Sequence, residues 1–351
     1  MIRVAAFAGG RTVPSARFRV SQLVAPLRAH GIAMTPCLAR FGTYPPRARL
    51  ARPFWLAATL ADRLPDVLRS HRFDVTFLQR ELVSTLETWE RLTRRPRVLD
   101  VDDAVWLHRG GGFIRRIARR CDAVICGNAF LAEYFAGVLR AVHVVPTAVD
   151  TARFTPRGGP RTDAILGWSG SASGLPYLHA IEDALAAVLE ARPAARLRVV
   201  CDAAPRFSRL PPGRVEFVPW SPHTEVTALQ DLAVGLMPLP DTDWERGKCS
   251  FKMLLYMACG VPVVVSPVGM NREVLGLGRV GLAAGEPGAW VDAIVGLLDD
   301  LPMAAAMGAE GRRVVERHFA VDRIAAQVAA VLHGVAGTGL AERQLGGRDG
   351  N

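Results

Sequence analysis

Short apolar runs alternate with segments of helical periodicity along almost the whole chain. Within each run the apolar residues are consecutive rather than every second residue, as in strands that are buried on both faces of a parallel sheet. The runs are residues 2–9, 32–39, 74–79, 97–103, 123–128 and 142–147 in the first half, and 165–170, 196–202, 215–220, 234–240, 261–267 and 280–285 in the second. This alternation predicts an α/β fold with parallel sheets covered by helices on both faces.

A segment rich in proline, glycine and charge, residues 153–164, interrupts the pattern and predicts a linker. The 351 residues are 50% hydrophobic, which is enough for two domains with separate cores. We therefore predict a first domain at 1–155 and a second at 164–318. A helical segment at about 319–335 follows, and residues 336–351 are predicted to be a disordered tail.

The charge is concentrated in the first half of the chain. The formal net charge is +10, and residues 1–165 carry 26 arginines against 13 acidic residues. This excess indicates an anionic partner, either a phosphate-bearing substrate or a membrane surface, unless it serves only solubility. Zinc-finger spacing and aromatic-basic RNA-binding signatures are missing from the sequence, so no nucleic acid is predicted. The basic run 115–120 is either a solvated helix face or a site of attachment to anionic lipid.

The cysteines, the first residues and the short length of the apolar runs suggest a cytoplasmic protein. The six cysteines form no CxxC pair and have no histidine at metal-ligand spacing, so we predict buried, reduced thiols and no zinc site. The first residues lack the charged start and long apolar core of a secretion signal, and no run has the length of a membrane span. Contact with the inner face of a membrane remains an alternative to a fully soluble protein.

Two lysines stand out because every other basic residue of the 43 is arginine. Lys248 and Lys252 lie four residues apart in "ERGKCSFKMLLYMACG", where we predict a helix from Phe251 to Cys259 with Ser250 as its N-cap. A lysine in the first turn lies at the positive end of the helix dipole and is unfavourable there, unless an anion binds. The pattern indicates a phosphate site, and two solvated surface lysines are the alternative.

Glycine-containing loops follow the first strand of each domain. In "GWSGSASG", Gly170 and Ser171 would let the backbone approach a ligand, although the same residues also make ordinary turns. In "AGGRTVPSARFRV", Gly10, Arg17 and Arg19 could hold an anionic group from the side of the first domain. The alternative is a turn followed by a solvated arginine face.

Polar residues also follow two later strands of the first domain. In "LDVDDAVW", Asp100, Asp102 and Asp103 could bind Mg²⁺, but helix capping, a salt link to an arginine, or a hydrogen bond to an acceptor hydroxyl explains them equally well. We assign no metal. Asn128 is expected to cap the helix that begins at "AFLAEYF", with a place in a ligand cleft as the alternative.

Taken together, these segments resemble the GT-B glycosyltransferases, specifically the retaining, sugar-nucleotide-dependent enzymes of family 4. The resemblance rests mainly on "GKCSFKMLLYMACGVPVVVSPVGMNREV", and "VVPTAVDTARFTP", "LDVDDAVW" and "ICGNAFLAEYF" also resemble segments of that family. It implies two Rossmann-like doubly wound domains facing a cleft, with the nucleotide diphosphate sugar on the second and the acceptor on the first. The last helices would cross back onto the first domain. The resemblance implies neither a metal nor any other cofactor.

The resemblance also implies roles for individual residues. Lys248 and Lys252 would stabilise the leaving diphosphate, helped by backbone groups of Gly170, Ser171 and Ser250. The other residues expected around the donor are Glu245, Arg246, Gly247, Gly269 and Glu273, and those on the acceptor side are Gly10, Arg17, Arg19, Asp102, Asp103 and Asn128. The family usually has two glutamates eight positions apart, and here these positions are Gly247 and Leu255.

The sequence therefore predicts a glycosyltransferase that moves a sugar from a nucleotide diphosphate sugar to a saccharide or lipid-linked acceptor, in the synthesis of cell-surface polysaccharide. Two alternatives stay open. One is a nucleotide-sugar epimerase or phosphorylase of the same fold. The other is a protein that binds nucleotide sugars without turnover.

Overall fold

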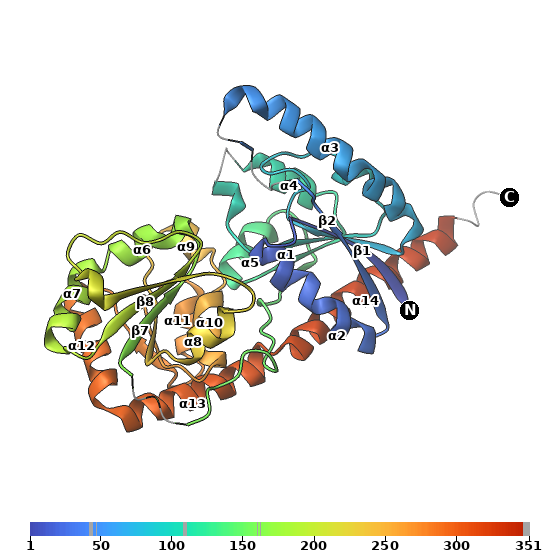
Figure 1. Ribbon diagram of the computed structural model, residues 1–351. Helices are drawn as coiled ribbons and strands as arrows, with labels where there is room; N and C mark the ends of the chain where they lie inside the picture. The colour runs from blue at the N-terminus through green and yellow to red at the C-terminus, as the bar shows by residue number, and fades with distance from the viewer. Residues whose placement is uncertain (42–44, 47, 108–110, 160, 162, 347–351) are drawn as a thin grey trace. The chain divides into compact units, whose positions relative to one another are not determined.

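A computed structural model describes residues 1–41, 45–46, 48–107, 111–159, 161 and 163–346 (Figure 1). The chain divides into two compact units. Unit 1 contains Met1–Ala148, Gly247–Cys249 and the residues from Val321 onward, and unit 2 contains Val149–Arg246 and Ser250–Ala320. Each unit is an α/β domain with one parallel sheet of six strands, as the apolar runs predicted.

The sheet of unit 1 has the strand order β2-β1-β3-β4-β5-β6, and every neighbouring pair is parallel. Its strands are β1 (Ile2–Ala8), β2 (Ile32–Leu38), β3 (Val75–Gln79), β4 (Arg97–Val101), β5 (Ala123–Cys126) and β6 (Val142–Val144). All six strands expected from the first half of the sequence are confirmed. The order reverses at β1, so the loops after β1 and β3 leave the sheet at its topological switch point, where ligands bind in such sheets.

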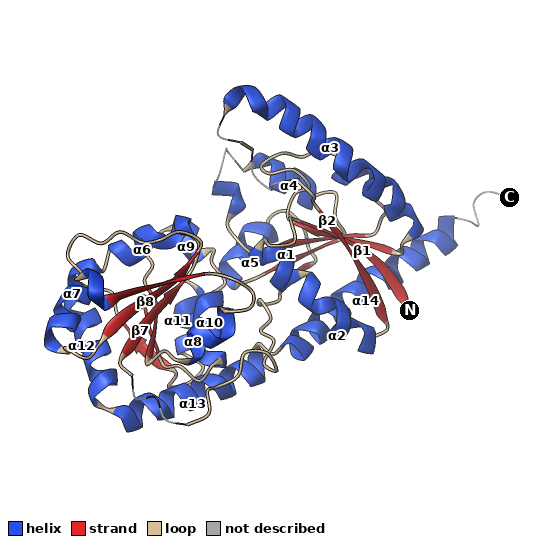
Figure 2. Cartoon of the chain, in the orientation of Figure 1, coloured by secondary structure: helices blue, strands red, loops and turns tan. Residues whose placement is uncertain are grey.

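Helices cover the sheet of unit 1 on both faces (Figure 2). They are α1 (Pro14–Arg19), α2 (Val24–Ala29), α3 (Arg52–Arg69), α4 (Gly112–Ala118), α5 (Ala129–Ala136) and α14 (Val321–Gly346). The last helix supplies Ile324, Val328 and Leu332 to the core of this unit, at the spacing of one helix face. The C-terminal helix α14 is thus an integral part of unit 1.

Unit 2 has a second sheet of the same kind, with the order β12-β11-β10-β7-β8-β9. Its strands are β7 (Ile165–Ser169), β8 (Arg196–Cys201), β9 (Val215–Pro219), β10 (Val234–Met237), β11 (Val263–Val265) and β12 (Gly281–Ala283). Its helices are α6 (Leu175–His179), α7 (Glu182–Ala191), α8 (Glu225–Gln230), α9 (Asp243–Arg246), α10 (Phe251–Ala258), α11 (Met270–Leu275), α12 (Pro287–Asp299) and α13 (Leu301–His318). All six expected strands are again present.

The structure differs from the expected organisation at two places. Residues 149–155, expected in the first domain, belong to unit 2, because Phe154 is buried there and its carbonyl accepts a hydrogen bond from Arg312 of α13. The segment expected to be disordered from residue 336 is helical as far as Gly346. Good helix formers such as Leu340, Ala341 and Gln344 outweigh the two glycines before them. Residues 347–351 of the predicted tail lie outside the described residues.

All six cysteines are buried and unpaired, which confirms the expectation of reduced thiols in apolar surroundings. Burial raises the pKa of the Cys126 thiol to about 12, and those of Cys37, Cys121 and Cys259 to the same value. Within the described part of the chain, no helix combines the length and the apolar character needed to cross a bilayer.

Candidate functional site

The side chain of Lys252 lies beside the loop that follows β7. Its Nζ is 4.6 Å from the centre of the Trp168 ring, and the lysine is half-buried. A Cβ added at Gly170 would lie 2.5 Å from that ring and 2.9 Å from Nζ. The loop therefore needs glycine at this position, and the structure brings Lys252 and Gly170 together, as expected for two parts of one site.

The same loop is tied to α10 through a buried tyrosine. The hydroxyl of Tyr256 accepts a hydrogen bond of 2.7 Å from the backbone N–H of Ser169, at the end of β7. Burial raises the pKa of Tyr256 well above its ordinary value, so the hydroxyl remains protonated. Strand β7 and helix α10 thus fix the place of the loop relative to Lys252.

Ser250 precedes α10 but does not cap it in the expected way. Its backbone is left-handed, with φ +50°, and its side chain accepts no capping hydrogen bond from α10. Instead, its buried hydroxyl donates to Oδ1 of Asn271 at 2.7 Å, and Asn271 donates in turn to the carbonyl of Ser266. The hydroxyl is used to join α10 to α11, so any contact of this residue with a ligand falls to its backbone.

The rest of the loop after β7 is held by hydrogen bonds within the loop and to the residue that follows β8. The hydroxyls of Ser171 and Ser173 lie 2.9 Å apart, at the start of the 3-10 helix η6 (Ala172–Gly174). The N–H of Ala172 donates to Asp202, which follows β8, at 2.7 Å. Asp202 therefore fixes the backbone of this glycine and serine loop.

The remaining residues expected near the donor are placed in several ways. Glu245 is buried and accepts hydrogen bonds from the hydroxyls of Tyr177 and Thr242. Arg246 is exposed and pairs with Asp241 at 2.7 Å and with Asp243. The carboxylate of Glu245 is thus occupied by partners within unit 2. The hydrogen bond from Arg246 to Asp241 raises the pKa of the arginine.

Two further donor residues belong to α11 and the turn before it. Gly269 has φ +51°, and a Cβ there would lie 2.8 Å from the carbonyl oxygen of Arg246, so a side chain is excluded. Glu273 lies in the first turn of α11 and is exposed. A carboxylate at this end of a helix is favoured by the helix dipole and is accessible to a ligand.

The segment Gly247–Cys249 is assigned to unit 1. The side-chain amide of Asn128 donates to the carbonyl of Lys248 at 3.0 Å, and its oxygen accepts from the N–H of Leu131 at 2.9 Å. Asn128 thus caps α5, as expected, and also holds the Lys248 backbone. A Cβ at Gly247 would lie 2.6 Å from that of Ala104, which explains the glycine.

The two aspartates after β4 are paired with an arginine that the sequence did not single out. Arg80 contacts Asp102 at 2.6 Å and also hydrogen-bonds Asp103. Burial raises the pKa of Asp103, while the charges of Arg80 and Lys248 oppose this rise. Of the alternatives left open for these carboxylates, the structure favours the salt link.

Arg19 is not placed to bind an acceptor, contrary to the expectation. It is 3% exposed, its Nε donates to Asp100 at 3.1 Å, and its Nη1 donates to the carbonyl of Val145 at 2.9 Å. Burial alone would lower the pKa of Arg19, but Asp100 raises it, so the guanidinium stays charged inside the domain. Arg17 is half-buried, with its guanidinium 4.6 Å from the ring of Phe18.

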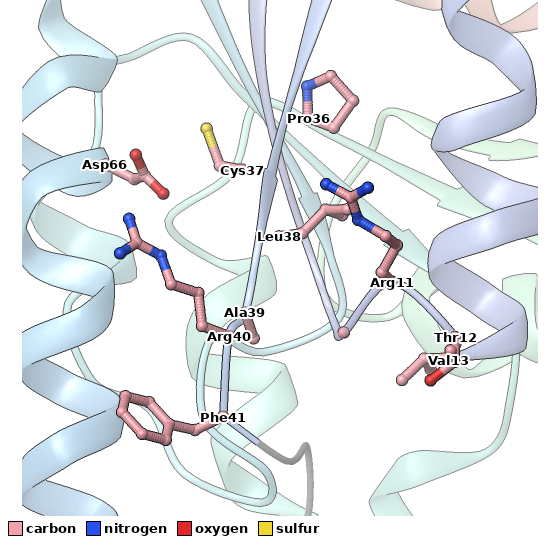
Figure 3. A pocket seen from close by; sticks show the side chains of 11 residues that line it. Arg11, Thr12, Val13, Pro36, Cys37, Leu38, Ala39, Arg40, Phe41 and Asp66 are labelled. Carbon is pink, nitrogen blue, oxygen red and sulfur yellow. The ribbon is translucent and has the colours of Figure 1, made fainter.

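The loop after β1 lines a cavity of about 550 Å³ in unit 1 (Figure 3). Gly10 is part of its wall, with residues from the end of β2 and one aspartate of α3. The lining residues are Gly10, Arg11, Thr12, Val13, Pro36, Cys37, Leu38, Ala39, Arg40, Phe41 and Asp66. Two arginines and a threonine hydroxyl give the cavity groups that bind anions or hydroxyls.

The basic run 115–120 is largely engaged within the domain. Arg116 and Arg120 both pair with Glu87, at 2.7 and 2.8 Å, and the guanidinium of Arg115 lies 5.0 Å from the centre of the Tyr134 ring. These contacts favour the interpretation of the run as a structured helix face rather than a lipid site.

The structure thus separates the two lysines by unit. Lys252 lies with Gly170 and Trp168 in unit 2, whereas Lys248 lies near Asp103 and Asn128 in unit 1. Sequence reasoning missed the residues that position these groups, namely Trp168, Tyr256, Asp202, Asn271 and Arg80. Trp168 and Asp202 could have been found from their places at the ends of β7 and β8, beside the glycine loop.

Comparison with known proteins finds a family that matches most of the second half of the chain. Residues 166–300, which include the loop after β7, Lys252 and α11, match the family model described as "Glycosyl transferases group 1". This stretch is similar to the group 1 glycosyl transferases. The resemblance to GT-B glycosyltransferases is thereby confirmed, and membership of family 4 stays a prediction.

A curated relative agrees with this family. Over 79 residues the chain is 40% identical to the lipopolysaccharide core biosynthesis mannosyltransferase LpsB of Rhizobium meliloti (strain 1021). The match covers 21% of this chain, and it spans about a fifth of the length of that relative. It supports the glycosyl transferase family without fixing the sugar or the acceptor.

Solved structures extend the likeness of fold over the whole chain. Sucrose-phosphate synthase from Thermosynechococcus elongatus is 16% identical, with a TM-score of 0.69 over 96% of this chain and 100% of that one. Anabaena HepE in complex with UDP-glucose is 15% identical, with a TM-score of 0.65 over 95% and 100%. These likenesses show that both domains share the glycosyl transferase fold.

Proposed function

We propose that the protein is a glycosyltransferase that moves a sugar from a nucleotide diphosphate sugar to a saccharide or lipid-linked acceptor. The family of residues 166–300 and the kind of relative matched, a mannosyltransferase of lipopolysaccharide core biosynthesis, support a role in the synthesis of cell-surface polysaccharide. The structures of Anabaena HepE in complex with UDP-glucose and with UDP support a nucleotide sugar as donor.

The observation that carries this proposal is the position of Lys252 against the loop of Gly170. A cation lies here beside a glycine backbone, on the domain that matches the glycosyl transferase family. A compact ammonium fits between the Trp168 ring and Gly170, where a broad guanidinium would meet both. Such a site suits an oxygen of a diphosphate better than a neutral ligand.

In the proposed reaction the bond between the anomeric carbon and the diphosphate oxygen breaks, and a bond to an acceptor hydroxyl oxygen forms. Negative charge develops on the departing diphosphate, and the hydroxyl proton passes to an oxygen of that diphosphate or to water as the new bond forms. Lys252 stabilises this charge, because a fixed cation needs no reorganisation during the reaction. Retention of the anomeric configuration and independence from a metal belong to the proposal.

The acceptor would bind on unit 1. The cavity that includes Gly10 offers Arg11, Thr12 and Arg40 to the hydroxyls or phosphates of an acceptor. Lys248 lies near Asp103 in this unit, so its role is proposed to be electrostatic, through that carboxylate or the diphosphate.

The test measures release of nucleotide diphosphate from a panel of sugar nucleotides, with and without saccharide and lipid-linked acceptors. Lys252→Ala and Lys252→Arg should each lower the rate by about 100-fold or more, because both remove the compact charge from the leaving group. Arg209→Ala is the matched control. It removes one exposed charge of unit 2, paired with Asp183 at 2.9 Å, and should leave the rate unchanged.

The outcomes separate the alternatives. Thermal stabilisation by a donor without release of nucleotide diphosphate by the wild type would identify a binding protein and contradict the proposal. Release that requires inorganic phosphate would indicate a phosphorylase, and release with epimerised free sugar would indicate an epimerase. Near-normal rates in both Lys252 variants would remove the role proposed for that residue.

A further inference from the structure

Helix α3 exposes a strip of apolar residues on one side, while Thr59, Arg63 and Val67 are buried on the other. Among the described residues, the large exposed apolar side chains include Leu50, just before α3, and Phe54, Leu64 and Leu68 within it. Leu50 is 90% exposed, Phe54 79% and Leu68 63%. Together with the exposed Ala57, Ala61 and Pro65, they lie along one side of the helix at helical spacing. We name the seven residues the α3 apolar face.

The opposite side of α3 carries the groups that attach it to the domain. Arg63 is 2% exposed and donates to the carbonyls of Cys37 and Ala8, at the ends of β2 and β1. Asp62 accepts from the N–H of Arg40 at 3.0 Å, and Asp66 lines the cavity beside β2 (Figure 3). A surface helix normally turns its apolar stripe inward, so this orientation requires another explanation.

The orientation is not a consequence of a small or poorly formed helix. Helix α3 has 18 residues, which corresponds to about 27 Å, and Thr59, Arg63 and Val67 are buried at regular spacing along it. The helix is therefore fixed in place by its buried side, which combines polar and apolar residues. Its other side is the exposed apolar strip.

The exposed charges at the two ends of the strip are positive, and one of them, Arg69, also pairs with Asp66 at 3.3 Å. Exposed arginines lie at both ends of the helix, at Arg49 in the turn before it and at Arg69 and Arg72 after the last apolar residue. The sequence contains nine arginines and no acidic residue before Asp62. An apolar strip with cations at both ends fits a surface that is apolar inside and anionic at its edge.

We propose that the α3 apolar face is the surface by which this protein binds a bilayer that contains anionic lipid. The helix lies in the plane of the interface, with Leu50, Phe54 and Leu68 among the acyl chains and the arginines at the level of the headgroup phosphates. This attachment is independent of the transfer reaction. It places the cavity beside β2, which shares Arg40 and Asp66 with the surroundings of α3, next to the membrane surface.

A second copy of the chain is a poorer occupant of the same strip. Two such helices packed face to face would bring the arginines of both copies together, in either orientation. Like charges at this distance repel, and the described exposed residues of the strip offer no carboxylate to balance them. Anionic lipid supplies the missing charge.

The test compares sedimentation of the full-length protein with two kinds of vesicle, one of phosphatidylcholine alone and one of phosphatidylcholine with phosphatidylglycerol. The wild type should bind the anionic vesicles, and raised salt should weaken the binding. Phe54→Glu with Leu68→Glu should weaken it by about ten-fold or more, because two buried apolar side chains become charged. The matched control is Leu277→Glu with Leu301→Glu, which changes two exposed leucines of unit 2 and should bind like the wild type.

Each result decides the matter. Far-ultraviolet circular dichroism and thermal unfolding of both double variants verify that they are folded, since all four positions are exposed. The proposal is overturned if the wild type ignores anionic vesicles, or if the α3 variant binds them as well as the control. It is also overturned if light scattering finds a dimer that the α3 variant alone dissociates. Donor turnover is measured separately, so failure of vesicle binding leaves the proposed reaction untouched.

Discussion

At the scale of single residues, the site in unit 2 depends on what is small as much as on what is charged. The ammonium of Lys252 and the ring of Trp168 both lie within the space that a side chain at Gly170 would need. The ring attracts the cation by its negative face. Gly170, Trp168 and Lys252 therefore form one cluster, of which the sequence suggested only the glycine and the lysine.

Gly170→Ala should disturb the cluster of Gly170, Trp168 and Lys252 without changing any charge. The added methyl group meets the Trp168 ring at 2.5 Å, so the ring or the loop has to move, at a cost of about 1–3 kcal/mol of stability. Displacement of Lys252 should lower nucleotide diphosphate release by about ten-fold or more. Denaturant unfolding and the release assay measure the two effects. Gly285→Ala, where a Cβ meets no atom within 4 Å, should change neither.

At the scale of elements, α14 shows how distant parts of the chain complete one domain. Its residues Ile324, Val328 and Leu332 are in the core of unit 1, although the 169 residues of unit 2 separate them from the preceding core residue in the sequence, Ala148. Because the helix supplies one wall of that core, unit 1 cannot be fully packed until the end of the chain has been made. Its interior side chains should therefore determine the stability of the first domain.

Leu332→Ala should lower the free energy of unfolding of unit 1 by about 2–5 kcal/mol, since a fully buried leucine leaves a cavity. Gln327→Ala, at an exposed position of the same helix, should change it by less than about 0.5 kcal/mol. Denaturant unfolding followed by circular dichroism compares the two variants. Equal stability of the two would contradict the role of α14 in the core.

The elements were largely predictable, and the contacts between side chains were not. Twelve strands could be predicted because each is a short apolar run between helical segments. Most are buried on both faces, whereas the edge strands β6, β9 and β12 are partly exposed. Helix α10 was predicted from Phe251 to Cys259 and is found from Phe251 to Ala258, so its position was predictable although Ser250 does not cap it. The left-handed backbone of Ser250, the burial of Arg19 and the outward apolar side of α3 were not predictable, because each depends on a partner far away in the sequence: Asn271, Asp100 and the ends of β1 and β2.

At the scale of the whole molecule, charge is distributed by domain. The 26 arginines among residues 1–165 include buried ones that join elements, such as Arg19, Arg63 and Arg97, so only part of the positive charge faces solvent. Arginine suits both roles, because its planar group can serve several carbonyls at once and stays charged when buried. The chain uses lysine at two positions only, and both lie in the segment that follows α9.

Because the chain has only two lysines, Lys252 can serve as a spectroscopic reporter. Reductive methylation with ¹³C-formaldehyde would label Lys248, Lys252 and the N-terminal amine, and would leave every arginine unmodified. Because the Lys252 ammonium lies 4.6 Å above the indole of Trp168, the ring current should move its methyl resonance upfield, and Lys252→Arg should remove that signal. A two-dimensional NMR spectrum without an upfield-shifted methyl signal would contradict the stacking, and titration with sugar nucleotides would follow donor binding at one identified atom.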